Sequence, residues 1–277
     1  EAEDMLRLIH KHRISHMHIV PTMFVRLLRL PQEVRQRYDG SSLRFITHGA
    51  APCAPAVKRQ MIEWWGPVIN EYYGATETGV VVWHGSEDAL RKPGTVGRLV
   101  PGGILRIVDE EGRDVKPGEV GEIYVRGPNL SEFTYNKDDA KRSEVGLGDL
   151  VTVGDVGYLD ADGYLFLCDR KRDMIISGGV NIYPAEIEGT LIQMPGVRDC
   201  AVFGIPDEEF GEQICAHIEA QPEAGLDASQ VRAWLGEHLA RYKVPRVVEF
   251  SAALPREDSG KIFKRKLRAP YWEKAGR

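Results

Sequence analysis

Apolar and polar positions follow two different rhythms along the chain, and the rhythm changes near residue 90. Over residues 1–90, short apolar runs typical of strands ("HMHIV", "LRFITHG", "PVINEYYG") alternate with helical patterns ("TMFVRLLRL", "APAVKRQMIEWW"). Strands that alternate with helices predict an α/β arrangement around a parallel sheet. Ligands of such sheets bind beyond the carboxyl ends of the strands, where "THGAAP" and "YYGATETG" fall.

From residue 91 to 169 short alternating runs such as "ILRIVD", "GEIYVRG" and "GYLFLCD" replace the helices, with turns at "DEEG" and "DADG". This pattern predicts antiparallel hairpins in a small β-barrel-like or sandwich-like subdomain. Residues 170–277 mix strands with helices, including an amphipathic helix for which Asp227 is the expected N-cap. The predicted fold class is α/β plus α+β: the end of a large α/β domain with a β-barrel-like subdomain, then a small α+β domain.

Composition narrows the class of protein. The 277 residues are 43% hydrophobic and 28% charged with a net charge of -5, which disfavours a general nucleic-acid binder. No apolar run approaches the roughly 18 residues of a membrane span, and the polar start is unlike a signal peptide. Four widely spaced cysteines without a CxxC pair predict buried free thiols in a reducing cytoplasm rather than a zinc site. They are Cys53, Cys168, Cys200 and Cys215.

The stretch "YGATETG" combines the residue types that a nucleotide site needs. Gly74 lets the backbone come close to a ligand, and Tyr73 offers a flat face for a purine. Thr76 offers a hydroxyl to a phosphate, and Glu77 offers an oxygen ligand to Mg²⁺. Taken alone, the same residues also fit a plain turn before a capped helix.

Two later motifs carry further chemistry. Asp155, in a glycine-flanked turn, can accept hydrogen bonds from both hydroxyls of a ribose, and Arg170 can add a charged donor. Lys261, in "PREDSGKIFKRKLR", follows a glycine at a place suited to a mobile loop. By themselves, these motifs also fit a solvated hairpin and a basic tail.

The order of these motifs resembles the later half of the AMP-forming acyl-CoA and aryl-CoA synthetases of the adenylate-forming superfamily. The resemblance covers nearly the whole chain and includes "THGAAP", "NEYYGATETG", "KPGTVGR", "GDVGYLDADGYL", "DRKRDMIISGGVNIYPAEIE" and "PREDSGKIFKRKLR". It implies that a carboxylate attacks the α-phosphate of ATP to give an acyl-adenylate and pyrophosphate, and that the thiol of CoA then displaces AMP. The implied ligands are therefore ATP or AMP, Mg²⁺ and CoA.

The resemblance also assigns roles to residues. Adenine is expected between Tyr73, followed by Gly74, and the backbone of Ala50 and Ala51. Thr76 is expected to contact phosphate and Glu77 to hold Mg²⁺. Asp155 is expected to bind the ribose, with Arg170 close by, and Lys261 to bridge the attacking carboxylate and the phosphate.

A reorientation of the last domain between the two reaction steps is also implied. Arg172 occupies the pivot position, and the rotation is expected to withdraw Lys261 and bring Gly178 and Gly179 to the CoA path. The expected division is 1–90, a partial α/β subdomain; 91–169, a β-rich subdomain; and 170–277, a mobile C-terminal domain. An ordinary linker arginine and a tight turn are the plainer alternatives for these residues.

The family pattern fails in one region. The Ser/Thr/Gly-rich phosphate loop that should precede the "YGATE" motif is missing from residues 1–72. The chain is therefore expected to be a piece of a longer enzyme and inactive alone. Val153 and Asp169 also replace the usual Thr and Gly. One alternative is an adenylating enzyme that transfers its acyl group to a carrier protein rather than to CoA. Another is a noncatalytic interaction fragment that self-associates as a homo-oligomer. A fatty or aryl acid is expected, but the individual acid is not identified.

Overall fold

The computed structural model describes residues 2–128, 145–257 and 261–276. Contacts divide the chain into two units, Glu1–Leu167 and Cys168–Arg277. The division falls inside one strand, β11 (Tyr164–Arg170). The three-part division expected from the sequence stays a prediction.

The first unit is built on one mixed sheet. Its helices are α1 (Ala2–His12), α2 (Pro21–Leu28), α3 (Gln32–Arg37), α4 (Pro55–Trp65) and α5 (Ser86–Arg91). Its strands are β1 (His16–Ile19), β2 (Phe45–His48), β3 (Ile69–Ala75), β4 (Gly79–His84), β5 (Gly97–Leu99), β6 (Ile104–Val108), β7 (Gly121–Arg126), β8 (Gly146–Leu147), β9 (Leu150–Val151), β10 (Asp155–Leu159) and β11. Their order in the sheet is β1-β2-β3-β4-β5-β11-β10-β7-β9-β8, and β6 pairs with β7.

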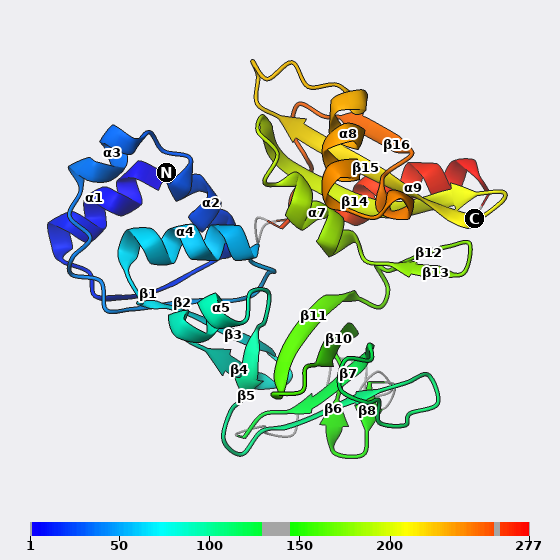
Figure 1. The fold of residues 1–277 in the computed structure, drawn as a ribbon, viewed down its shortest axis with the longest axis horizontal. Helices are drawn as coiled ribbons and strands as arrows, with labels where there is room; N and C mark the ends of the chain where they lie inside the picture. Colours follow the sequence, from blue (N-terminus) through cyan, green and yellow to red (C-terminus); the bar gives the residue numbers. More distant parts are fainter. Residues whose placement is uncertain (1, 129–144, 258–260, 277) are drawn as a thin grey trace. The chain divides into compact units, whose positions relative to one another are not determined.

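Helices α1, α2 and α4 cover one face of the start of this sheet (Figure 1). Leu6 and Ile9 of α1 lie three residues apart and so point to the same side of the helix, where both are buried. They pack with Phe24 of α2, Met61 of α4 and Ile46 of β2 in one cluster. A proline opens both α2 and α4, a position where its missing N–H is not needed. The predicted α/β start of the chain is thus present.

The β-rich segment differs from a β-barrel-like subdomain. In the described residues it does not close into a barrel: β5 pairs with β4, and β11 pairs with β5, so its strands continue the sheet that β1 to β3 begin. The alternation of apolar and polar residues along a strand indicates that one face is buried, but it does not indicate which strand lies next to it. The antiparallel strands were therefore predicted, whereas their common sheet with the parallel strands was missed.

The second unit is an α+β structure with its own sheet. Its elements are β12 (Ile175–Ser177), β13 (Val180–Ile182), α7 (Pro184–Leu191), β14 (Val197–Asp207), β15 (Gly211–Ala220), α8 (Ala228–His238), a 3-10 turn η1 (Arg241–Lys243), β16 (Val247–Phe250) and α9 (Lys264–Lys274). The strand order is β13-β12-β15-β14, and β16 runs parallel to β15. Asp227 caps α8 in a reciprocal capping box with Gln230, as its position in the sequence predicted.

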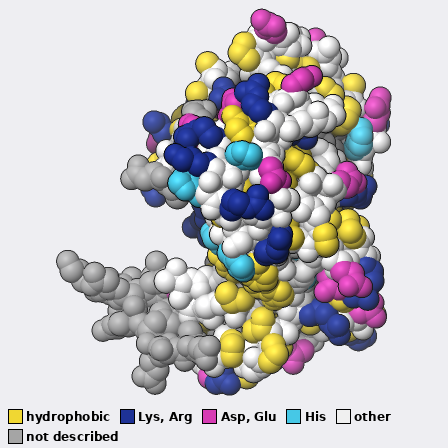
Figure 2. All heavy atoms as spheres, turned by 90° about the vertical axis from the view of Figure 1, so that its left-hand side faces the viewer, with side chains coloured by type: hydrophobic (Ala, Val, Ile, Leu, Met, Phe, Trp, Pro, Cys, Tyr) yellow, Lys and Arg dark blue, Asp and Glu magenta, His cyan; other side chains and the backbone are white. Residues whose placement is uncertain are grey.

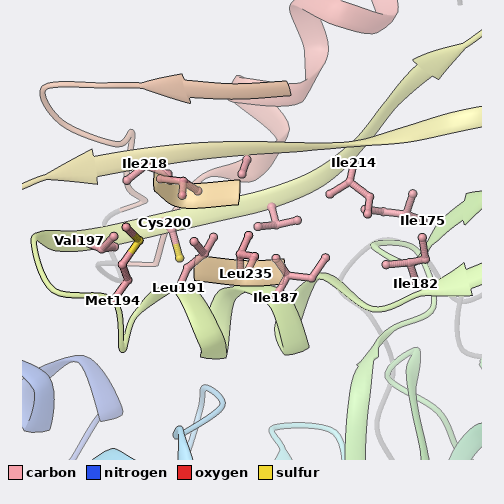
Figure 3. Close-up of a cluster of buried hydrophobic side chains, with 13 residues drawn as sticks. Ile175, Ile182, Ile187, Leu191, Met194, Val197, Cys200, Ile214, Ile218 and Leu235 are labelled. Carbon is pink, nitrogen blue, oxygen red and sulfur yellow. The ribbon is translucent and has the colours of Figure 1, made fainter. Parts of the chain in front are cut away.

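The hydrophobic core of the second unit lies between α7, α8 and the long β14–β15 hairpin (Figure 3). Ile187 and Leu191 of α7 are four residues apart and fully buried, and Leu235 of α8 packs in the same cluster. Ile175 and Ile182 extend this cluster to the β12–β13 hairpin. The packing fixes α7 on the strands that follow it.

The surface and the cysteines agree with the composition. Basic and acidic side chains lie side by side on the face shown in Figure 2. All four cysteines are free; Cys200 and Cys215 are buried, and Cys53 and Cys168 are partly buried. The longest helices of the described segments have 11 residues, about half the length that a bilayer crossing needs.

The core of the second unit provides a first test of the fold. Replacing Leu235 with Ala leaves a cavity among buried side chains and should lower the unfolding free energy by about 2–5 kcal/mol. Hydrogen exchange should therefore accelerate in β14 and β15 but not in β1 to β3. Arg232→Ala, at an exposed site of the same helix, is the matched control. Equal effects of the two variants would contradict the packing described here.

Candidate active site

The carboxyl end of β2 leads into an exposed turn with a strained backbone. Ala50 has φ 67°, one of two non-glycine residues with positive φ in the parts of the chain that the structure describes. The preceding Gly49 is buried, and a Cβ on it would lie 2.8 Å from the ring of Tyr72. Tyr72 therefore packs directly over this backbone, and its hydroxyl lies 3.0 Å from Nε2 of His18.

Tyr73 and Asp155, 82 residues apart in sequence, meet in the first unit. The hydroxyl of Tyr73 donates a hydrogen bond of 2.8 Å to Oδ2 of Asp155. Tyr73 exposes only 8% of its surface and packs in a cluster with Val81, Val82 and Leu165. A stacked adenine needs an exposed ring face, so stacking on Tyr73 requires the ring or its neighbours to move.

The "YGATETG" stretch forms a β-hairpin rather than a turn into a helix. β3 returns as β4 with Ala75 opposite Gly79. Thr76 is exposed at the turn, and Glu77 is partly exposed beside it. Gly74 is required because an added Cβ would lie 2.0 Å from the carbonyl oxygen of Gly79.

Thr78, for which no role was predicted from the motif, holds this turn together. Its hydroxyl accepts a hydrogen bond from the backbone N–H of Ala75 and donates one to the carbonyl of Gly79. Threonine hydroxyls commonly close turns in this way. A local pattern of glycines and threonines indicates such a turn but does not say which hydroxyl faces inward and which faces solvent.

The turn before Asp155 contains one departure from the family pattern, Val153 in place of the usual Thr. Thr152, one residue before Val153, is buried and accepts the backbone N–H of Gly154 at 3.0 Å. A hydroxyl is therefore present in this turn, but it serves the backbone. Asp155 follows as the first residue of β10, partly exposed.

The remaining predicted residues belong to the second unit. Arg170 and Arg172 are exposed at the end of β11 and just beyond it. The carbonyl of Arg170 accepts the backbone N–H groups of Asp173 and Met174, so the chain turns sharply there. Gly178 and Gly179, with φ 57° and 78°, form the two-residue turn between β12 and β13. Positive φ at both positions is the pattern of a tight hairpin turn, for which glycine is favoured.

Lys261 is exposed in a loop next to residues 258–260, which lie outside the described residues. Its carbonyl accepts the backbone N–H of Glu257, and Arg256 pairs with Ile262 across this loop. Three residues later, Nζ of Lys264 lies 2.7 Å from Oε1 of Glu188 on α7. Lys264 thus anchors the start of α9, while Lys261 is exposed in the loop before it.

Two sequence families match the chain, one in each unit. Residues 1–133 match the family described as "AMP-binding enzyme", and residues 186–261 match "AMP-binding enzyme C-terminal domain". The chain belongs to the AMP-binding enzyme family. The resemblance inferred from the motifs is therefore confirmed, as is the α/β plus α+β fold class.

Several relatives of this chain are CoA ligases. The indoleacetate–CoA ligase of Aromatoleum aromaticum is 39% identical over 269 residues, which are 97% of this chain and 52% of that protein. The long-chain-fatty-acid–CoA ligase of Bacillus subtilis is 35% identical over 265 residues, 95% of this chain and 47% of that protein. The solved anthranilate–CoA ligase AuaEII, in complex with anthranoyl-AMP, superposes with a TM-score of 0.88 at 31% identity, covering 100% of this chain and 53% of its own. The chain spans about half the length of the curated relatives it matches.

Asp169, the second departure from the family pattern, serves the start of α7. Its Oδ2 accepts the backbone N–H of Ala185 at 2.8 Å, in a helix whose own N-cap residue, Tyr183, makes no side-chain cap. Burial raises the pKa of Asp169, against the attraction of the ammonium group of Lys264. Asp169 therefore acts as a cap supplied from β11.

Replacing Asp169 with Gly, the usual residue of the family, should lower the unfolding free energy of the second unit by about 0.5–2 kcal/mol, because the cap is lost. Hydrogen exchange across α7 under native conditions measures this directly. Asp169→Asn keeps an oxygen acceptor and should lose less. A Gly variant as stable as the parent chain would contradict the capping role.

Proposed function

We propose that this chain forms the later half of an ATP-dependent acid–thiol ligase, an AMP-forming acyl-CoA synthetase. In the proposed reaction a carboxylate oxygen attacks the α-phosphate of ATP and pyrophosphate leaves. The CoA thiol then attacks the acyl carbon of the adenylate, a thioester forms, and AMP leaves. The family membership of both units and the CoA-ligase activity of the relatives support this proposal.

The observation that carries the proposal is the bond between Tyr73 and Asp155. It joins the first and the second predicted motifs at one place in the first unit. Tyr73 donates to one carboxylate oxygen of Asp155, and a carboxylate is the group that accepts the two hydroxyls of a ribose in dinucleotide sites. The exposed turns that carry Ala50 and Thr76 follow neighbouring strands, β2 and β3, so they suit the adenine and the phosphate. These residues suit the ribose, base and phosphate of AMP, provided that the Tyr73 ring or its neighbours move to expose a stacking face.

Glu77 is proposed to supply one oxygen ligand to Mg²⁺, which commonly binds through one or two carboxylates together with substrate phosphates. The metal would neutralise phosphate charge there. Lys261 is proposed to lie between the attacking carboxylate and the α-phosphate, where a positive charge reduces the repulsion of two anions. Its exposed position on a loop supports a side chain that reaches out to a substrate. Arg170 is proposed to add a second positive charge near the ribose.

The second reaction step is proposed to use the pivot at Arg172 and the turn at Gly178 and Gly179. Exposure of Arg172 just after a strand supports a role as a hinge, since hinges are commonly loop or element-terminal residues. The glycines offer a backbone without side chains to a narrow pantetheine chain. Both ideas rest on the match to the family motif.

The substrate is proposed to be an aryl or fatty acid. Indoleacetate and long-chain fatty acids are the acids named for two relatives, and anthranoyl-AMP is bound in the solved neighbour. A carrier protein as acyl acceptor stays the alternative within enzymes. An acceptor comparison, CoA against a pantetheinylated carrier, separates the two.

The first-unit contacts can be tested on this chain. AMP should bind weakly, and Asp155→Ala should reduce its affinity by about 10–100-fold, because hydrogen bonds to a charged group are lost. Isothermal titration of AMP measures the effect. Asp162→Ala, at an exposed carboxylate in the β10–β11 turn, should bind as the parent does. Equal affinities for all three chains, or no AMP binding by the parent, would contradict the proposed site.

Catalysis is tested by ATP–pyrophosphate exchange over a panel of aryl and fatty acids. We expect little turnover from this chain, whose residues 1–72 lack the phosphate loop. In a longer chain that carries both the loop and this sequence, Lys261→Ala should slow exchange by about 10²–10³. Robust turnover by the 277 residues alone would refute the need for the loop. Self-association without AMP binding would favour a noncatalytic fragment.

A further inference from the structure

A row of polar side chains crosses the first unit and has no part in the contacts proposed above. The strand registers place His48 of β2 beside Glu71 of β3, and Glu71 beside His84 of β4. Neighbours in register point to the same face of a sheet. Ile69, two residues before Glu71, packs against the helices, so this is the face that α4 covers.

Lys58 of α4 completes a cluster with two of these residues. Its Nζ contacts Oε2 of Glu71 and lies 3.3 Å from Nε2 of His84. Nε2 of His84 lies 2.7 Å from Oε2 of Glu71, and its Nδ1 lies 2.9 Å from the carbonyl of Gly85. Lys58, Glu71 and His84 are called the Glu71 cluster below.

The cluster is almost fully buried. Lys58 and Glu71 are each 3% exposed and His84 is 2% exposed. Burial raises the pKa of Glu71, but the hydrogen bond from His84 and the charge of Lys58 outweigh it and hold the pKa below its ordinary value. Glu71 is therefore a carboxylate in the core, and removing Lys58 or Glu71 alone leaves the other charge buried and uncompensated.

His48 lies beside the cluster as a neutral group. Its Nδ1 is 3.8 Å from Oε1 of Glu71, and neither ring nitrogen has a hydrogen-bond partner among the described residues. Burial lowers the pKa of His48 to about 4, against the attraction of Glu71. The carboxylate is thus held by Lys58 and His84, with His48 packed next to it.

Stability alone does not account for such a cluster. Apolar residues of similar volume often stabilise a core as well as a buried ion pair does, whereas the charged groups demand one geometry. Each member of the Glu71 cluster is joined to a segment that carries proposed contacts. Lys58 lies near the start of the helix that follows Ala51, and Glu71 lies two residues before Tyr73. His84 ends the strand that returns from the Thr76 turn.

The strained turn at Ala50 needs such support. A non-glycine residue with positive φ persists only where its surroundings fix it. The strand before this turn ends at His48, which is paired in register with Glu71, and the helix after it carries Lys58. Glu71 therefore bonds to the helix after the turn through Lys58, and its carboxylate lies 3.8 Å from His48 at the end of the strand before the turn.

We propose that Glu71 is a positioning residue: held by Lys58 and His84, it fixes the carboxyl ends of β2 and β3 relative to one another and so shapes the nucleotide site. The expected effect on AMP affinity rests on the proposed AMP site, whereas the expected effect on the strand ends does not. The test therefore has two readouts, hydrogen exchange at the strand ends and affinity for AMP.

The main variant is Lys58→Met/Glu71→Leu in the 277-residue chain, which removes both charges without leaving one unpaired. Glu71→Gln, which keeps the shape and an acceptor oxygen, is the milder second variant. The matched control is Ser86→Ala. The buried Ser86 bonds both backbone groups of Ile69 at the opposite end of β3, so its loss weakens the same strand away from the site.

We expect the double variant to speed exchange of residues 49–51 and 73–75 by about 10-fold or more and to weaken AMP binding by about 10-fold, as loss of partners that orient ligating groups typically does. Glu71→Gln should show smaller shifts in the same segments, and Ser86→Ala should change only the start of β3. A folded double variant whose strand ends exchange as the parent's do would overturn the proposal. If the double variant does not fold, unchanged exchange in Glu71→Gln overturns it. If the parent binds no AMP, the AMP site fails, and exchange alone decides the positioning role.

Discussion

β3 is the strand at which the sheet of the first unit changes from parallel to antiparallel pairing, and the candidate site depends on this change. On one side β2 runs parallel to β3, so its carboxyl end, with the Ala50 turn, lies at the same edge as the carboxyl end of β3. On the other side β4 returns antiparallel, so the hairpin turn that carries Thr76 lies at that edge as well. Polar groups from segments far apart in sequence are thereby gathered by backbone pairing, before any side chain contributes.

Features that depend on residues close together in the sequence were predicted, and features that depend on distant partners were not. The strand ends at "THGAAP" and "YYGATETG" were predicted because local apolar runs and glycines report them. The cap at Asp227 was predicted for the same reason, since its partner is three residues away. The shared sheet of the parallel and antiparallel strands was not predicted, because the pairing of β5 with β11 joins residues nearly 70 positions apart and leaves no periodic signal.

The Glu71 cluster was missed for a related reason. One carboxylate in "INEYY", one lysine in "VKRQM" and one histidine in "VVWHG" each interrupt an apolar pattern. Such interruptions usually mark exposed positions, and only the register of three strands together with the packing of α4 brings these three into contact. Asp169 is similar: its departure from the family pattern was visible, but its partner is a backbone N–H 16 residues later. Polar residues that break an apolar run in separate elements are the signal that a search for buried partners can use.

Burial and hydrogen bonding differ between the candidate site residues of the first unit and those of the second. Hydrogen bonds within the first unit join the hydroxyl of Tyr73 to the carboxylate of Asp155 and close the turn through Thr78. Arg172 and Lys261, in contrast, are exposed side chains in turns or loops of the second unit. Local opening needs little free energy where contacts are sparse and much where they are dense. The hydrogen bonds of Tyr73, Asp155 and Thr78 therefore favour a rigid strand edge in the first unit, where the nucleotide is proposed to bind.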